Sequence, residues 1–267
     1  MILNTFLAFI TEEAEKGHEE GAGWILEHVL DHVILKLPTV LGIDLSITFH
    51  VLMIWIAAAL LILVFSLGTR KVGLVSKGFG SVLESLVIFL RDDVLVPYLG
   101  DKWKRYAPYI LTAFFFILTC NLLGLIPKGG TPTSNINVTA TMAVLTFLIG
   151  QSAGMRKKGF VGYWKSFIPP EIPAFVVPIL FFAEVMGLFT KHFALAIRLF
   201  ANMIADHLIV FTFLGLIFIF KNFLVALFAV PAAAAIELLA VLIAFIQAYI
   251  FTMLSAVFIG IALSEEH

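Results

Sequence analysis

Long apolar runs constrain this chain more than any other feature of its sequence. The stretch 47–67 is uninterrupted by charge, and the stretch 191–264 is apolar almost throughout. About 20 apolar residues are enough to cross the hydrocarbon core of a bilayer as an α-helix. We therefore expect an all-α polytopic membrane protein.

The composition agrees with this class. Hydrophobic residues make up 61% of the 267 residues and charged residues 13%, against roughly 45–50% and about 25% in soluble domains. The formal net charge of −1 gives no basis for a nucleic-acid surface. The single cysteine, Cys120, can form neither a disulfide within the chain nor a thiolate metal cluster by itself.

The apolar runs predict about five membrane-embedded helices. The predicted segments are 47–67, 108–127, 138–154 and 179–189, followed by a long C-terminal helical hairpin over 191–264. Lys221 and Asn222 interrupt the last stretch and mark the turn of the hairpin. Four prolines between 169 and 178 predict a break in the helical structure before the fourth segment.

One further segment is too polar to span comfortably. Residues 79–98 mix apolar side chains with Glu84, Arg91 and two aspartates, which predicts an amphipathic helix lying along the membrane surface. Residues 47–267 would then form a single membrane domain, preceded by an acidic segment over 1–46. Because the first residues lack the basic lead-in of a signal peptide, we expect the chain to be used as written.

Lysine and arginine predict the orientation. Most of them fall within 70–77, 102–105 and 156–165, and successive spans bring all three groups to the same side. Cytoplasmic loops are enriched in these residues, so this side is expected to be cytoplasmic. The N-terminus would then be extracytoplasmic and the C-terminus cytoplasmic.

Ionisable residues inside the apolar runs are the candidates for function. A central arginine, lysine or aspartate costs about 2.5–3.5 kcal/mol on insertion scales, so these residues mark ion paths by default. The candidates are Glu184, Arg198, Asp206, His207 and Glu237, with the amides Asn202 and Gln247 as companions. Taken alone, Arg198 could instead reach an interface or pair with a buried acid. His207 alone could equally form a structural pair with a carboxylate.

Arg198 shares a predicted helix face with small residues. At 3.6 residues per turn, Ala194, Ala201, Asn202 and Ala205 lie on the same face. Small residues let a partner helix come close. This arrangement favours a functional arginine over an isolated structural one.

The residues around Arg198 carry a specific resemblance. The run Ala-Leu-Ala-Ile-Arg-Leu-Phe-Ala-Asn-Met at 194–203 resembles the signature around the essential arginine of subunit a of F-type ATP synthases. Other features resemble this family in order and approximate spacing: Asn-Leu-Leu-Gly-Leu-Ile-Pro at 121–127, residues 135–139, Glu184, Gln-Ala-Tyr-Ile-Phe at 247–251 and the terminal Ser-Glu-Glu-His. Together they cover most of the chain.

The resemblance implies a stator beside a rotor ring whose small subunits each carry one carboxylate at mid-membrane. Two offset half-channels would lead to the ring from opposite faces, with Arg198 between them, so that ion flow turns the ring and drives ATP synthesis. Arginine suits this position because it stays charged in proteins. The resemblance places Glu184 in the cytoplasmic half-channel, Asp206, His207 and Glu237 in the outer one, and Asn202 and Gln247 beside the arginine.

One position departs from the family pattern. The family commonly carries an ionisable residue where this chain has Ala240, paired with the residue that matches His207. Here Glu237 lies one turn earlier. Residues one turn apart share a helix face, so Glu237 is able to take the same place.

The resemblance also implies partners and a location. The expected partners are the c-ring, against which the hairpin would pack, the peripheral-stalk subunit b, the rest of the ATP synthase, lipid, and protons or sodium ions, in a bacterial plasma membrane. The sequence contains no phosphate-loop, zinc or nucleophile motif, so no cofactor is expected and ATP chemistry is left to partner subunits. A self-contained ion-coupled secondary transporter is the alternative, although the repeated halves typical of transporters are missing.

Overall fold

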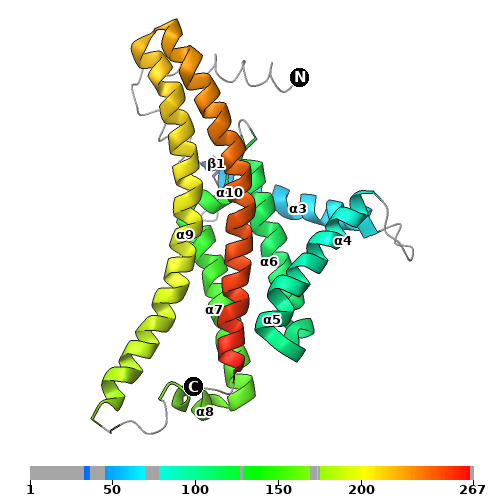
Figure 1. Cartoon of the computed structure of the whole chain (residues 1–267), viewed down its shortest axis with the longest axis vertical. Helices are drawn as coiled ribbons and strands as arrows, with labels where there is room; N and C mark the ends of the chain where they lie inside the picture. Colours follow the sequence, from blue (N-terminus) through cyan, green and yellow to red (C-terminus); the bar gives the residue numbers. More distant parts are fainter. Residues whose placement is uncertain are drawn as a thin grey trace. The chain divides into compact units, whose positions relative to one another are not determined.

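The computed structural model is almost entirely helical. It describes residues 33–36, 46–69, 78–126, 129–168, 173 and 175–264. In chain order the elements, drawn in Figure 1, are β1 (Val33–Leu35), β2 (Ile47–Thr48), α3 (Phe49–Thr69), α4 (Phe79–Leu90), η1 (Arg91–Leu95), α5 (Val96–Leu99), η2 (Gly100–Lys102), α6 (Trp103–Gly124), η3 (Pro132–Ser134), α7 (Ile136–Lys158), α8 (Phe160–Lys165), α9 (Val177–Phe220) and α10 (Phe223–Leu263). The basic group at 70–77, the end of the chain at 265–267 and most of the acidic segment over 1–46 lie outside the described residues.

The predicted class is confirmed by five helical stretches in the described part of the chain that are long and apolar enough to cross a membrane. They are Phe49–Gly68, Gly80–Gly124, Ile136–Lys158, Val177–Ile217 and Phe223–Leu263. The protein is therefore an all-α polytopic membrane protein. The placement of 79–98 along the membrane surface, and the domain boundary at residue 47, stay predictions.

The prediction of a separate fourth helix over 179–189 is wrong. Helix α9 continues through Thr190 and Lys191 without a break, because neither residue prevents helix formation and lysine is a good helix former. The Thr190 hydroxyl donates to the Met186 carbonyl oxygen at 2.8 Å, so this polar side chain is satisfied within the helix. Pro178 lies in the first turn of α9, where a proline has no hydrogen bond to break.

Helices α9 and α10 are much longer than a single span. They contain 44 and 41 residues, which correspond to about 66 and 62 Å at 1.5 Å per residue. The hydrocarbon core of a bilayer is only about 30 Å thick. Helices of this length must tilt strongly or extend beyond the core.

The chain divides into two compact units, which are described separately. Unit 1 contains the described residues within Met1–Leu63, Phe116–Asn135 and Leu199–Gln247. Unit 2 contains those within Val64–Phe115, Ile136–Arg198 and Ala248–His267. Both long helices contribute to both units, since the division falls after Arg198 in α9 and after Gln247 in α10.

In unit 1 the second part of α9 and the first part of α10 form the predicted hairpin. Its apolar core consists of Val210, Leu214 and Ala233, with Phe213, Ile217 and Ile236 packed against them. Lys221 ends α9 with a φ of 46°, a left-handed conformation common at helix C-termini. The Asn222 Oδ1 atom accepts the Leu224 backbone N–H at 2.9 Å and caps α10. The predicted turn is confirmed.

In unit 2, α7 packs against the last part of α10. A methyl group added at Gly154 would lie 3.2 Å from the Ala262 carbonyl oxygen, so only a small residue allows this approach. About two turns earlier on both helices, the Thr146 hydroxyl lies 3.2 Å from the Ser255 hydroxyl. Both contacts advance in the same chain direction, so the two helices run parallel here.

A π-helical turn, η1, follows α4 in unit 2. The Tyr249 hydroxyl of α10 donates to the Asp93 carboxylate in this turn at 2.6 Å. Its neighbour Asp92 accepts a hydrogen bond of 2.7 Å from the Arg91 Nε atom. The turn therefore re-aims Asp93 so that it contacts α10, which fits the use of π-helical turns to reposition side chains.

Candidate ion-path sites

Arg198 lies on an exposed face of α9. Its neighbours on that face, Ala194, Ala201 and Ala205, are exposed as well, while Asn202 is half-buried. Among the described residues, none forms a hydrogen bond or an ion pair with the Arg198 guanidinium. Within the described residues, the arginine thus presents an unpaired charge on a surface of alanine methyl groups. The helix face of small residues that the sequence predicts is the exposed face of α9 here.

In unit 1 an amide pair joins the two arms of the hairpin. The Asn202 Nδ2 atom donates to the Gln247 Oε1 atom at 2.7 Å. Gln247 is 1% exposed, and its Nε2 atom has no hydrogen-bond partner among the described residues. The two amides that the resemblance places beside the arginine are therefore in direct contact with each other.

Also in unit 1, His207 contacts a loop residue. Its Nε2 atom lies 2.7 Å from the hydroxyl oxygen of Thr131, which comes from the loop before α7. The same loop supplies Thr133, whose hydroxyl donates to the Asn121 Oδ1 atom at 2.6 Å. The Asn121 Nδ2 atom in turn donates to the Ala244 carbonyl oxygen at 3.4 Å. Loop hydroxyls thus organise the polar groups around this part of α9 and α10.

The carboxylates of Asp206 and Glu237 form a third group of unit 1. They lie on α9 and α10 and are close enough to interact electrostatically. Both are half-buried, and the Asp206 Oδ2 atom is buried without a hydrogen-bond partner among the described residues. Ala240, where the family commonly carries an ionisable residue, is buried at 1% exposure. The two carboxylates of the outer set are thus within electrostatic range of each other, while the hydrogen bond of His207 goes to Thr131.

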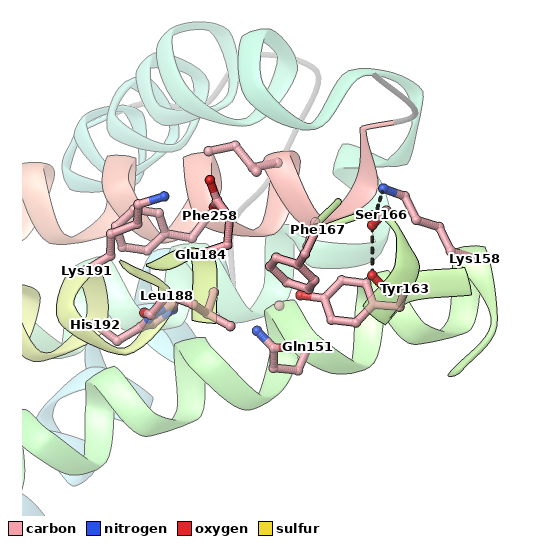
Figure 2. Close-up of a pocket in the computed structure, with 13 residues that line it drawn as sticks. Gln151, Lys158, Tyr163, Ser166, Phe167, Glu184, Leu188, Lys191, His192 and Phe258 are labelled. Atoms are coloured by element: carbon pink, nitrogen blue, oxygen red, sulfur yellow. Dashed lines mark hydrogen bonds between the residues drawn. The ribbon is translucent and has the colours of Figure 1, made fainter. Parts of the chain in front are cut away.

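Unit 2 contains a pocket lined by Glu184. It has a volume of about 60 Å³, and its lining includes Gln151, Lys158, Lys191 and His192 (Figure 2). A water molecule needs roughly 10–15 Å³ of such space, so the pocket has room for a few of them. Glu184 itself is exposed, and no hydrogen bond joins it to another described residue.

Tyr163 of α8 closes one side of this pocket. It is 3% exposed, and burial raises the pKa of its phenol, partly offset by a hydrogen bond with Gln151. The phenol therefore stays neutral near pH 7. Its role in the pocket wall is to pack and to hold Gln151, not to carry charge.

Three polar residues of these sites were missed by the sequence interpretation: Thr131, His50 and His192. His50 is buried in α3 of unit 1 and lies 3.4 Å from the Ser134 hydroxyl. A histidine near the start of an apolar run was the available signal for His50. Thr131 gave no comparable signal, because hydroxyl residues are ordinary in polar loops.

Comparison with known proteins gives a consistent result. The family model described as ATP synthase A chain matches residues 51–260. The chain is 46% identical over 233 residues to ATP synthase subunit a of Chloroherpeton thalassium, covering 84% of this chain and 69% of that protein. It is 44% identical over 278 residues to ATP synthase subunit a 2 of Prosthecochloris aestuarii, covering 95% and 83%. The match to subunit a of an Anaeromyxobacter strain is 40% over 293 residues, covering 92% and 72%.

Proposed function

The chain belongs to the ATP synthase A chain family, and on that basis we propose how its residues couple proton movement to rotation. It is the proton-translocating subunit of the membrane sector of a rotary ATP synthase and a multi-pass membrane protein. The function of the whole complex requires a rotor, and the rotor must pass the residue of this chain that controls the ion path.

Arg198 faces the carboxylate of a rotor subunit. This is supported by its exposure on a face of alanines and by the lack of a partner for it among the described residues. A lone cation at the bilayer centre is costly, whereas a facing carboxylate compensates the charge. Arginine stays charged and its guanidinium is weakly hydrated, while lysine loses its proton readily when buried. Arg198 therefore attracts the deprotonated rotor carboxylate and prevents protons from leaking straight across.

The outer half-channel is formed by Asp206, His207 and Glu237. The observations that support it are the proximity of the two carboxylates and the contact between His207 and Thr131. Histidine changes charge between roughly pH 5 and 8, so it exchanges protons readily with such neighbours. The joined amides of Asn202 and Gln247 lie on the same two helices and flank the arginine.

The cytoplasmic half-channel begins at Glu184. The supporting observation is the pocket that Glu184 lines, which has room for water and is bordered by Lys158 and Lys191. Lysines and arginines cluster on the cytoplasmic side of membrane proteins. In this orientation the N-terminus is extracytoplasmic and the C-terminus cytoplasmic.

The remaining partners follow from the same proposal. The chain is a non-catalytic stator subunit: the c-ring moves against its C-terminal hairpin, and subunit b of the peripheral stalk holds it in place. ATP chemistry occurs in partner subunits, and the complex lies in a bacterial plasma membrane. A self-contained secondary transporter is not favoured, because the related proteins are named as subunits of a larger enzyme.

The deciding experiment measures ATP-driven acidification of vesicles that contain the complete complex. We expect Arg198→Ala to abolish pumping and Arg198→Lys to impair it severely, with normal amounts of assembled subunit on a blot. Arg105→Ala is the matched control, because Arg105 is an exposed arginine at the start of α6. Normal pumping by assembled Arg198→Ala would make the arginine structural and would end the proposal.

A further inference from the structure

A buried histidine borders the pocket of unit 2 without a role in the half-channel described above. His192 is 6% exposed and lines the pocket together with Glu184 and Lys191, its neighbours on α9. Figure 2 shows these three side chains around the pocket, with Gln151 of α7 also lining it. The position of an ionisable ring beside this space calls for an explanation.

The hydrogen bond of the ring defines its protonation. The Nδ1 atom lies 2.9 Å from the Leu188 carbonyl oxygen, and because a carbonyl only accepts, Nδ1 carries a proton. In the neutral ring, Nε2 is then the acceptor. Nε2 is buried and has no hydrogen-bond partner among the described residues. Since buried polar atoms are almost always hydrogen-bonded, water in the adjoining pocket is the natural donor to Nε2.

Two aromatic rings hold His192 in this orientation. Phe147 of α7 meets it edge-on with ring centroids 5.2 Å apart, and Phe258 of α10 lies at 4.9 Å. A ring packed on both sides cannot turn over freely. Nε2 must therefore receive and release protons on the same side, while Nδ1 stays bound to the Leu188 carbonyl.

The charged and titratable groups around the pocket come from three helices. Helix α7 supplies Lys158, α8 supplies Tyr163, and α9 supplies Glu184 and Lys191. The residues from α10 are apolar. Glu184 is thus the one carboxylate among the described lining residues, and it is the group with which a histidine exchanges a proton most directly.

We propose that His192 is a proton-binding relay of the cytoplasmic half-channel, exchanging protons with Glu184 through water in this pocket. The inference rests on the proposed function, because it needs Glu184 to lie on the ion path. In the forward step Nε2 takes a proton from a pocket water, which is itself reprotonated by the Glu184 carboxyl group. The reverse step returns the proton to the Glu184 carboxylate, so no proton is created or lost.

The test is passive proton conduction through the membrane sector in inverted vesicles stripped of the ATP-hydrolysing part. Conduction is measured while the pH on the cytoplasmic side is varied from roughly 5 to 8, the range in which imidazole changes charge. We expect His192→Gln to conduct more slowly and to lose the pH-dependent step of the wild type. Phe167→Leu is the matched control, since Phe167 lines the same pocket but packs against Tyr163 and Trp164. It should keep the step.

Several outcomes would overturn the inference. One is an unchanged pH profile in assembled His192→Gln, or in His192→Asn if the first variant does not assemble. Loss of the step in Phe167→Leu as well would assign the effect to packing of the pocket wall. Glu184→Gln separates the proposed role of Glu184 from the inference about His192. Normal conduction by this variant overturns the cytoplasmic half-channel together with the inference. Impaired Glu184→Gln beside normal His192→Gln overturns the inference alone.

Discussion

The candidate ion-path side chains of unit 1 and those of unit 2 lie in different surroundings. In unit 1 the groups touch: Asn202 contacts Gln247, and Thr131 contacts His207, each at 2.7 Å. In unit 2, Glu184 and His192 border a pocket of about 60 Å³. These four side chains of unit 1 thus depend on direct contacts, whereas Glu184 and His192 of unit 2 border space that water is able to fill.

The difference predicts different sensitivities. A direct side-chain contact fails when either partner is removed or displaced, because a buried polar atom is then left without a hydrogen bond. Water-mediated contacts adapt, since a bridging molecule is able to shift or be replaced. Matched substitutions in the two units should therefore differ in effect, and the following three begin with the largest.

Gln247→Leu should cause the greatest loss. It removes the acceptor of the Asn202 amide in a buried setting, and an unsatisfied buried group costs about 1–3 kcal/mol. We expect less assembled subunit on a blot and a large fall in ATP-driven acidification. The matched variant is Gln151→Leu in unit 2, where pocket water replaces the lost hydrogen bonds. Equal damage from the two variants would break the comparison.

Gly124→Ala should have an intermediate effect on pumping. The added methyl group would collide with the Thr131 side chain, including its hydroxyl, so the hydroxyl must leave the position in which it contacts His207. The lost hydrogen bond is worth only about 0.5–1.5 kcal/mol, and the subunit should still assemble. Acidification measured at equal subunit level should fall clearly below that of the wild type. An unaltered rate would mean that the contact between Thr131 and His207 does not serve the outer half-channel.

Gly150→Ala should have the smallest effect. It adds the same methyl group at the pocket of unit 2, where the new atom would meet Ile259 in ordinary contact at 4.0 Å. Replacing a mid-helix glycine by alanine stabilises a helix by roughly 0.5–1 kcal/mol. Pumping and thermal stability of the complex should match or slightly exceed those of the wild type. A loss as large as that of Gly124→Ala would show that unit 2 is as tightly constrained as unit 1.

Much of the fold could be predicted from the sequence, because the bilayer demands apolar runs of a known length. Lys221 and Asn222 marked the hairpin turn correctly, since few other polar residues interrupt the C-terminal stretch. Lys191 misled the interpretation: a charge near the end of an apolar run resembles the end of a span, yet α9 passes through it. Charge indicates where lipid ends, and it does not indicate where a helix ends.

The site could be predicted only in part. Asn202 and Gln247 were predicted to flank the arginine from the family pattern, and their contact with each other was not anticipated. Thr131 is 76 residues from His207 in the sequence, and nothing local to either residue signals their contact. His192 was overlooked because it follows Lys191, which was interpreted as a boundary. Contacts between distant segments arise from packing, which periodicity and spacing do not encode.

Because α9 continues through Lys191 without a break, it fixes both the distance and the angle between the side chains that it carries. Within unit 2 its fourteen-residue step from Glu184 to Arg198 amounts to about 21 Å of rise and nearly four full turns, at 1.5 Å and 3.6 residues per turn. The two side chains consequently point in similar directions. A single deleted residue would leave the two side chains about 140° apart, whereas four inserted residues would point them in nearly the same direction and add about 6 Å. Insertions in this segment should therefore keep the two side chains aligned only when they add about a whole helical turn.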